Sequence, residues 1–282
     1  ERICLVLGRD KEAIAMLITF IGGGNMATAL ISGLVNPPRA HIRIRVSDPN
    51  EHARQHLGDT FQVPTFTDSV EAIDGADVIV LAVKPQNMPD VLEKIGCRIT
   101  RDQLVLSIAA GITIASIEEH LGNDRSVIRS MPNTPALIGH GITGVTAGEH
   151  CSRQQRDQAE EILAAAGEVV WLEEESLMDA ITAVSGTGPA YYFLMTEALA
   201  QAARELGLPG DIADRLAAIT CFGAGAMMAT SPDEAVELRR RVTSPGGTTE
   251  AAMAILEGDG FHQLMLRAVE AARDRSRDLA LK

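Results

Sequence analysis

Three consecutive glycines lie near the start of the chain, between a short apolar stretch and a segment of helical character. The segment Ile18–Ala27 has the sequence ITFIGGGNMA and contains the pattern G-x-G-x-x-A through Gly22, Gly24 and Ala27. The first glycine permits a tight turn, the second lets the backbone approach a phosphate, and the small third residue allows close packing of helix on sheet. Amides at the start of the helix would then bind a pyrophosphate. A glycine-rich turn without a ligand is the alternative, but the position after a strand favours a dinucleotide site.

A carboxylate, Asp48, ends the next predicted strand, about twenty residues beyond the glycines. At that place a carboxylate accepts hydrogen bonds from the hydroxyls of the adenosine ribose. Aspartate is also a favoured helix cap, and a helix is predicted to begin near Pro49. We therefore expect Asp48 to contact the ribose, to cap this helix, or to do both.

A second segment with chemical potential, Ser244–Thr249, has the sequence SPGGTT and precedes a predicted helix. Gly246 and Gly247 allow backbone conformations that other residues avoid, and the serine and threonines add hydroxyl groups. Successive amides at a helix start form an anion site that needs no cation. The carboxylate of a small substrate fits such a site. The alternative is an ordinary capped helix start with Glu250 in its first turn.

Three further loops follow predicted strands, at the ends where ligands bind to open parallel sheets. They are Val83–Gln86, Ala109–Gly111 and Met131–Pro135. Proline and glycine fix the backbone in these loops, which would arrange amides around a flat ring such as nicotinamide. Lys84 is either part of this site or a solvated surface lysine, and its position between valine and proline favours the site.

The elements that position the first group of motifs form an α/β pattern as far as Leu172. Apolar runs without alternation, joined by helices, are typical of a parallel sheet covered on both faces. The predicted strands are Ile18–Ile21, Ile42–Ser47, Val78–Val83, Leu104–Ile108, Val127–Met131 and Val169–Leu172. The predicted helices are Asn25–Val35, Asn50–Leu57, Gln86–Ile95, Ile114–Leu121 and Arg153–Ala166. We therefore predict an α/β fold for residues 16–172, with a doubly wound parallel (Rossmann) sheet that binds a dinucleotide.

After Glu173 the pattern changes, and residues 173–282 are predicted to form an all-helical domain. The predicted helices are Leu177–Val184, Ala190–Leu206, Asp211–Ala229, Pro232–Arg240, Thr249–Glu257 and Phe261–Leu281. The last of them has an apolar stripe at helical spacing, for which packing in its own core is the simplest interpretation. An Ala-rich helical tail nevertheless buries its apolar faces better when two subunits exchange helices. We therefore expect a dimer.

Composition excludes several classes of function. A net charge of −13 over 282 residues makes a nucleic-acid groove or an anionic membrane surface an unsuitable partner. We find no apolar run of the ~18 residues that a membrane span needs. The four cysteines and seven histidines show no metal-ligand spacing, so we expect no metal site and a reducing, cytoplasmic location. Residues 1–15 carry charges unlike a signal peptide and precede Met16 and the first strand, so we expect a dispensable extension.

Five segments carry the most distinctive motifs of the chain. They are IGGGNM at 21–26, VKP at 83–85, MPNTP at 131–135, AVSGTGPAY at 183–191 and VTSPGGTT at 242–249. In this order, and over roughly residues 16–280, they resemble the pyrroline-5-carboxylate reductase family. Many dehydrogenases share the first motif, whereas the last two together are close to unique to this family.

The resemblance implies a reductase of proline biosynthesis that transfers a hydride from NADPH or NADH to 1-pyrroline-5-carboxylate and forms L-proline. It implies a Rossmann domain followed by a helical domain that intertwines two subunits, in a homodimer that assembles further, for example into a decamer. It also places the imine substrate beside the nicotinamide, at the junction of the domains.

By motif position, the resemblance also implies the roles of individual residues. The hydroxyl near the substrate nitrogen, and hence the catalytic role, falls on Thr249. Substrate binding falls on Glu175, Ser244, Gly247, Thr248 and Thr249. Cofactor binding falls on Ile21, Gly22, Gly23, Gly24, Asn25, Met26, Asp48, Ser69, Val83, Lys84 and Ala110. For Glu175, which ends a run of three glutamates, the alternative is a solvated helix N-terminus.

Three positions depart from the family's pattern and concern the cofactor. Asp48 and Ser69 stand where members often have serine and asparagine beside a 2′-phosphate, and Arg241 replaces an asparagine that touches the cofactor in some members. A carboxylate repels the 2′-phosphate of NADPH, whereas Arg54 or Arg45 could pair with it. We therefore expect both cofactors to work, with NADH relatively better than in members that have serine at this position.

Two rival functions are a β-hydroxyacid dehydrogenase-like enzyme and a non-catalytic, dinucleotide-sensing dimer. The dehydrogenases use a lysine from the first helices of their second domain, and the segment that starts at Ser185 has none there. The intact SPGGTT loop that ends at Thr249 argues against the sensor. Reduction of a cyclic imine therefore remains the main expectation.

Overall fold

The computed structural model describes residues 15–280, and the expectation about the N-terminal extension therefore falls, except for Ala15, outside the described residues. The chain divides into two compact units. Unit 1 comprises the chain up to Ile181 and again from Ser276 onward, and unit 2 comprises Thr182–Arg275. Each unit has its own architecture and is described separately.

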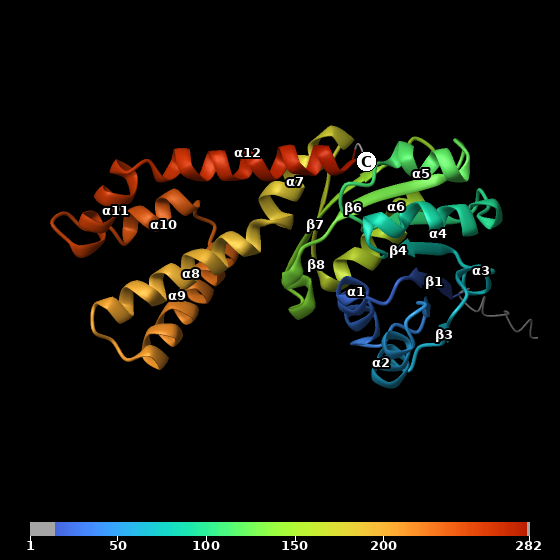
Figure 1. Ribbon diagram of the computed structural model, residues 1–282, viewed down its shortest axis with the longest axis horizontal. Coiled ribbons are helices and arrows are strands. Elements are labelled where there is room, and N and C mark those ends of the chain that lie inside the picture. Colours follow the sequence, from blue (N-terminus) through green and yellow to red (C-terminus); the bar gives the residue numbers. More distant parts are fainter. Residues whose placement is uncertain (1–14, 281–282) are drawn as a thin grey trace, which may run out of the picture. The chain divides into compact units, whose positions relative to one another are not determined.

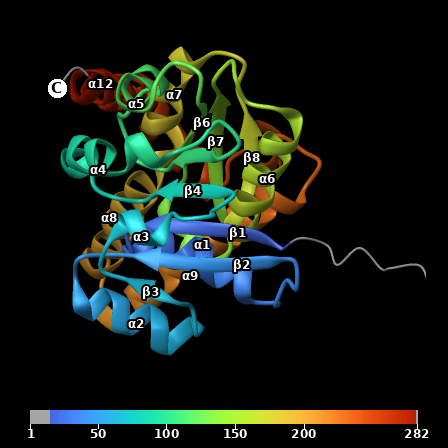
Figure 2. The same cartoon turned by 90° about the vertical axis from the view of Figure 1, so that its right-hand side faces the viewer.

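Unit 1 is built on an eight-stranded sheet with the strand order β3-β2-β1-β4-β5-β6-β7-β8 (Figure 2). The strands are β1 (Met16–Ile21), β2 (Ile42–Ser47), β3 (Thr65–Phe66), β4 (Val78–Leu81), β5 (Leu104–Ser107), β6 (Ser126–Met131), β7 (Gly141–Ala147) and β8 (Gly167–Trp171). Neighbouring strands are parallel, except for β6 and β7. The chain runs from β1 outward to β2 and β3 and then returns to β4 on the other side of β1. This reversal creates the switch point at which α/β sheets bind ligands.

Helices cover both faces of this sheet (Figure 2). They are α1 (Asn25–Val35), α2 (Glu51–Phe61), α3 (Ser69–Ala72), α4 (Met88–Ile95), α5 (Ile114–Leu121), α6 (Arg153–Leu163) and α7 (Met178–Ile181). Residues of α1, α2 and α6 belong to one apolar cluster, and residues of α4 and α5 belong to the other. In β4, Val78 and Val80 join the first cluster while Ile79 and Leu81 join the second. Burial on both faces explains why the strands are apolar without alternation.

The α/β fold with its Rossmann-type sheet is confirmed, but the sheet is mixed and not wholly parallel. The sequence prediction misses β7, which lies antiparallel to β6. With the sequence GITGVTA, β7 contains two glycines and two threonines, which dilute the apolar signal of a buried strand. The prediction also misses the two-residue strand β3 and the four-residue helix α3, which are too short to show a period.

The unit boundary lies at Ile181, later than the expected boundary at Leu172. Between these positions α7 contacts β6 and β7, so this first helical segment packs with the sheet. The last turn of α12 (Phe261–Ala280) also belongs to unit 1, where the Ser276 hydroxyl donates to Asp179 Oδ1 of α7 at 2.8 Å. The chain therefore passes from one unit to the other twice.

Unit 2 is helical throughout (Figure 1). It contains a π-helical turn at Thr182–Gly186, α8 (Gly188–Glu205), α9 (Gly210–Thr230), α10 (Ala235–Arg241), α11 (Thr248–Gly258) and the larger part of α12. The expectation of helices alone in this part of the chain is confirmed. Helices α8 and α9 lie side by side, joined by a short turn (Figure 1).

The motif AVSGTGPAY forms the π-helical turn and the start of α8. The Thr187 amide donates to the Thr182 carbonyl at 2.8 Å, one residue further back than in an α-helix. The widened turn frees the carbonyl of Ala183, and the Tyr191 hydroxyl donates to it at 3.0 Å. Threonine and tyrosine in this motif thus stabilise a local backbone shape.

Large apolar side chains of unit 2 are exposed in the single chain. Phe193 in α8 and Phe222 in α9 are each 68% exposed, and Ile219 in α9 is 62% exposed. The buried residues of α8 and α9 are all small, namely Gly188, Ala200, Ala213 and Ala217. By length and composition alone α9 could also cross a membrane, which the sequence prediction did not foresee, and only 11% of its apolar window is buried.

Candidate active site

The glycine motif forms the turn between β1 and α1. Gly22 has φ +103°, and a Cβ there would lie 2.5 Å from the Ala82 carbonyl oxygen, so only glycine fits. Gly24 is the N-cap of α1, no side chain caps it, and a Cβ there would meet nothing within 4 Å. The first turn of α1 contains no acidic residue. Free amides that face open space at the positive end of a helix fit the pyrophosphate of a dinucleotide.

Asp48 is tied directly to this turn. Its Oδ2 accepts the Gly23 amide at 2.7 Å, and its Oδ1 accepts the Asn50 amide at 2.8 Å. The N-cap of α2 is Asn50, whose side chain accepts the Ala53 amide, so the expectation that Asp48 caps this helix is wrong. The carboxylate is partly buried beside the glycine motif, in the position from which a ribose contact is expected.

The two arginines nominated as partners for a 2′-phosphate are engaged with the backbone. Arg54 Nη1 donates to the carbonyls of Asp48 and Pro49 at 2.7 and 2.9 Å. Arg45 Nη1 donates to the Asp74 carbonyl at 3.0 Å, and its guanidinium lies over the ring of Phe66. The charged group that contacts the glycine motif directly is therefore the carboxylate of Asp48, whereas the two arginines bond to carbonyl groups elsewhere.

The expected cofactor residues gather along one edge of the sheet. Ser69, Asp48, Ile21, Val83 and Ala110 lie at or just beyond the carboxyl ends of β3, β2, β1, β4 and β5, which are consecutive neighbours. Ile21 and Ser69 are buried, whereas Asp48, Val83 and Ala110 are partly exposed. The fold thus brings this set together at the switch point, while their contacts with a cofactor stay a prediction.

Lys84 and the first residues of α1 lie on the exposed side of the same edge. Lys84 is exposed and makes no ion pair with any residue of the described range 15–280. Asn25 is exposed, whereas Met26 is partly buried and packs against the core. The solvated-lysine interpretation and the cofactor interpretation both fit this environment of Lys84.

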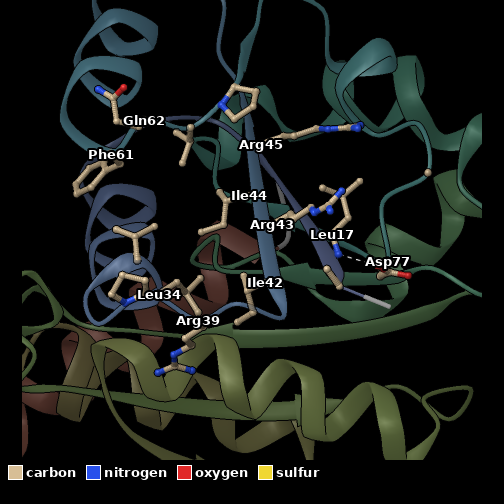
Figure 3. Close-up of a pocket in the computed structure, with 16 residues that line it drawn as sticks. Leu17, Leu34, Arg39, Ile42, Arg43, Ile44, Arg45, Phe61, Gln62 and Asp77 are labelled. Atoms are coloured by element: carbon tan, nitrogen blue, oxygen red, sulfur yellow. Dashed lines mark hydrogen bonds between the residues drawn. The ribbon is translucent and has the colours of Figure 1, made fainter. Parts of the chain in front are cut away.

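A hollow of about 820 Å³ lies at the opposite end of the sheet and is a poor candidate for the site (Figure 3). It is lined by the amino ends of β1 and β2 and by the ends of α1 and α2, with Arg39, Arg43 and Arg45 among its residues. Asp77 at its rim accepts the Leu17 amide at 2.7 Å, which anchors β1 (Figure 3). Apart from Arg45, the residue nominated as a possible phosphate partner, none of the sequence-predicted site residues lines it.

The SPGGTT loop forms the turn between α10 and α11 in unit 2. Gly246 has φ +72°, and the Gly247 amide donates to the Ser244 carbonyl at 3.0 Å. A Cβ on Gly247 would lie 2.6 Å from Ser244 Oγ, so the second glycine brings the backbone against the serine hydroxyl. Gly247 is the N-cap of α11 and receives no side-chain cap. Ser244, Gly247, Thr248 and Thr249 are therefore brought together.

Two acidic or hydroxyl side chains complete this loop. Thr249 is partly buried in the first turn of α11, and its hydroxyl makes no hydrogen bond with any residue between 15 and 280. Glu250 Oε2 accepts the Gly246 amide at 2.7 Å. A carboxylate therefore binds at this helix start, although the Gly246 amide is occupied by Glu250. Glu250 thus lies in the first turn as the alternative expects, but its bond is to the residue before the N-cap, and Gly247 itself receives no side-chain cap.

Glu175 lies in unit 1, away from the SPGGTT segment along the chain and in a different unit. Its Oε1 accepts the Ile114 amide at 2.9 Å and Arg129 Nη1 at 2.8 Å. It is therefore no simply solvated helix end, and the predicted contact with the substrate is not tested by these bonds. Sequence reasoning missed Arg129, although a single arginine within the apolar strand Ser126–Met131 is a signal for a buried ion pair.

Metal and thiol chemistry find little support in the described residues. Within residues 15–280 no group of three or more His, Cys, Asp or Glu side chains is arranged to hold a metal ion. The Cys151 thiol donates to the Val127 carbonyl, and burial raises its pKa, so it is a poor nucleophile.

Comparisons with known protein families match both parts of the chain. A model described as pyrroline-5-carboxylate reductase dimerisation matches residues 175–279. A model described as NADP oxidoreductase coenzyme F420-dependent matches residues 17–111. The first match covers unit 2, and the second covers the strands that carry the glycine motif.

Whole proteins and solved structures give the same result over nearly the full length. The pyrroline-5-carboxylate reductase of Pseudomonas aeruginosa is 46% identical over 93% of this chain and 96% of its own. That of Corynebacterium melassecola is 41% identical over 93% of this chain and 98% of its own. The structure of the Coxiella burnetii pyrroline-5-carboxylate reductase has a TM-score of 0.89 at 40% identity and covers 93% of this chain and 98% of that one. The structure of the Plasmodium falciparum pyrroline carboxylate reductase with NADP bound has a TM-score of 0.82 at 28% identity. It covers 95% of this chain and 99% of that one.

Proposed function

The chain belongs to the pyrroline-5-carboxylate reductase family, and from this premise we propose that it reduces 1-pyrroline-5-carboxylate to L-proline with NADPH or NADH. The observation that carries the proposal is the turn before α11, where the helix start has no side-chain cap and the Thr249 hydroxyl makes no hydrogen bond with any residue between 15 and 280. A small cyclic imino acid has the carboxylate and the nitrogen that these groups can receive. The protein is therefore an oxidoreductase of proline biosynthesis.

The carboxylate of the substrate binds to the amides of the SPGGTT loop. Gly246 already donates to a carboxylate oxygen of Glu250, and Gly247 has no side-chain cap. The dipole of α11 and the hydroxyls of Ser244 and Thr248 favour the same negative charge. This loop therefore orients the ring of the substrate.

Thr249 binds the nitrogen of the imine. When bound, the dinucleotide supplies a hydride from C4 of its nicotinamide ring to the imine carbon. A protonated C=N accepts a hydride much better than a neutral one, so the nitrogen must carry a proton when the new C–H bond forms. Thr249 is a weak acid in water, and its role is to hold the nitrogen by a hydrogen bond and to relay a proton from water.

The carboxyl edge of the sheet holds the dinucleotide. The amides of Gly24 and Asn25 receive the pyrophosphate, and Asp48, whose Oδ2 accepts the Gly23 amide, receives the hydroxyls of the adenosine ribose. The loops of Val83, Lys84 and Ala110 flank the nicotinamide. Both NADPH and NADH are used. Because of Asp48, NADH is a better cofactor relative to NADPH here than in family members with serine at this position.

The chain works in the cytoplasm as a homodimer that assembles into a larger oligomer such as a decamer. Exposed side chains of α8 and α9, such as Phe193 and Phe222, support burial against a second copy. The family model for this region describes dimerisation, which favours a protein partner over a membrane for the apolar helix α9. Light scattering on the purified protein distinguishes a dimer from a decamer.

The test is to follow oxidation of NADPH and NADH separately at 340 nm with pyrroline-5-carboxylate and to quantify proline formed. We expect proline in a 1:1 ratio to oxidised cofactor with both dinucleotides. A protein that binds the dinucleotide without consuming it would be a sensor, and turnover of β-hydroxyacids instead would place it with the rival dehydrogenases. Either result contradicts the proposal.

A further inference from the structure

One arginine is buried in the sheet of unit 1. Arg129 is the only charged side chain among the buried residues of the described range 15–280, with its side chain 6% exposed. It lies in β6 two residues after Val127, on the sheet face that packs against α4 and α5. A buried guanidinium is costly unless an anion and further hydrogen bonds compensate it.

Glu175 supplies the anion and makes a second bond with the same oxygen. Oε1 lies 2.8 Å from Arg129 Nη1 and 2.9 Å from the amide of Ile114, while the side chain is 30% exposed. Ile114 is the first residue of α5, and its N-cap Thr113 accepts the Ser116 amide with its side chain. The glutamate therefore satisfies an amide that the helix itself leaves free, and the helix dipole favours its charge.

The hydrogen bond of the Ile114 amide to Glu175 holds the end of the loop that runs from β5 to α5. The other end of this loop is fixed by the Ser107 hydroxyl, which accepts the Ala109 amide at 3.3 Å. Ser130 of β6 donates to the Ser107 carbonyl at 2.9 Å and joins the two strands. Between these anchors lie Ala110 and Gly111, the latter with φ +77°. The loop is therefore held from β5 on one side and from the Glu175–Arg129 pair on the other.

We infer that Glu175 is a positioning residue for the dinucleotide, acting through the Ile114 amide on the loop at Ala110, and not a ligand of the imine. The inference rests on the proposed function only in naming the dinucleotide as the ligand of this edge. Arg129, which lies on a buried face of the sheet, orients the carboxylate of Glu175 by its hydrogen bond to Oε1. The pair thus links the backbone of the loop at Ala110 to a charge inside the core.

If the pair were purely structural, its loss would change the melting temperature and the affinity for the dinucleotide together. A positioning role predicts that these two properties can be changed separately. Replacing Glu175 by leucine leaves Arg129 buried without an anion and also releases the Ile114 amide. The double variant Glu175→Leu with Arg129→Met removes the buried charge as well, and apolar replacement of a buried pair restores stability in other proteins. It does not restore a bond to the Ile114 amide. Stability and loop position can therefore be told apart.

The experiment measures the melting temperature and, by calorimetry without imine, the dissociation constants of NADPH and NADH. Glu175→Leu is expected to lower the melting temperature and to raise both constants by roughly tenfold. In the double variant the melting temperature should recover towards that of the wild type while both constants stay raised. Glu161→Gln is the matched control, since it removes a carboxylate paired with Arg39 and His41 in the same unit, and it should leave both constants unchanged.

Two results would overturn the inference. Recovery of the dissociation constants together with the melting temperature would make the pair structural only. Unchanged dissociation constants in Glu175→Leu, with a raised KM for the imine, would make Glu175 a substrate ligand. If the wild-type protein did not reduce the imine but the constants behaved as expected, the proposed function would fail while the role of Glu175 would stand.

Discussion

Unit 1 buries its large apolar side chains, whereas unit 2 exposes many of its own in the single chain. In unit 1 the sheet residues Ile18, Phe20, Val80 and Leu106 are fully buried between two layers of helices. In unit 2 the buried residues of the longest helix, α9, are alanines, and its large side chains are exposed.

This difference teaches that the two units are stable for different reasons. Burial of a large apolar side chain contributes about 1.5–3 kcal/mol, and unit 1 obtains this contribution within one chain. Unit 2 can obtain it only from a second surface. We therefore expect dinucleotide binding to depend on contacts made within unit 1, and the SPGGTT loop of unit 2 to depend on burial against a second copy.

The largest effect is expected from charges placed on α9. Ile219→Glu with Phe222→Glu should abolish the dimer, because each lost burial is worth about 1.5–3 kcal/mol and occurs in both subunits. Light scattering should give a monomer, and imine reduction should disappear. The dissociation constant for NADH should change little, because unit 1 is untouched.

The control for this pair is Asp157→Lys, a change of charge at an exposed residue of α6 in unit 1. It should leave the mass and the activity unchanged. A double variant that remains dimeric would show that the exposed face of α9 does not stabilise unit 2 through a partner.

The next effect concerns chemistry in unit 2 at constant structure. Thr249→Ala should lower kcat about 100-fold, because it removes the group that holds the imine nitrogen. Binding of NADPH in unit 1 should be unchanged. Thr249→Ser should recover part of the rate, since it restores the hydroxyl, and Thr230→Ala, at the end of α9 and outside the SPGGTT loop, serves as the control. Normal turnover of Thr249→Ala at saturating imine would refute the role.

A smaller effect is expected in unit 1, on the choice of cofactor. Unit charges ~4 Å apart repel by about 4 kcal/mol at an effective dielectric of 20, and bonds from the Gly23 and Asn50 amides together with solvent reduce this. A remaining ~1.4 kcal/mol is about tenfold in affinity. Asp48→Ser should therefore lower the KM for NADPH by up to about tenfold and leave that for NADH nearly unchanged. Asp59→Ser, at the far end of α2, should change neither, and an unaltered KM for NADPH in Asp48→Ser would contradict the argument.

The smallest effect is a pH dependence confined to unit 2. Hydrogen bonds from Arg240 and then from Arg241 lower the pKa of Glu237 from its ordinary value of 4.5 to about 2. A lowered carboxyl pKa stabilises the fold above pH 4.5, and this stabilisation is lost as the pH falls towards 2. The melting temperatures of wild type and Glu237→Gln should therefore differ slightly at neutral pH and converge near pH 2. The gain is small because exposed ion pairs are screened by solvent.

Much of the fold could be predicted where the residue pattern is strong. Helices Asn25–Val35 and Ile114–Leu121 and strand Ile42–Ser47 begin and end where the sequence predicts. Strand Gly141–Ala147 could not be predicted, because its glycines and threonines resemble a loop and its pairing with β6 is a tertiary contact. The exposure of α9 could not be read from its composition either, since an apolar helix can be buried, paired or in a membrane.

The candidate site could be predicted as far as local sequence carries it. The glycine turn and the SPGGTT turn are local structures, so their geometry follows from the residues themselves. The contacts of Asp48 and Glu175 join residues that are 25 and 61 positions apart, and no pattern specifies them. Glu175 in particular looks like one of three solvated glutamates until Arg129 is found buried beside it.

The return of the chain to unit 1 has a consequence for its synthesis on the ribosome. Helix α7 leaves the ribosome before the whole of unit 2, whereas Ser276 and Arg277, which contact Asp179, are made after unit 2. At a translation rate of about 5–20 residues per second, the roughly 95 residues in between take about 5–20 s. The sheet can begin to fold during this time, whereas the contacts of α7 with the end of α12 must wait. Unit 1 can therefore be completed only after the whole of unit 2 has been made.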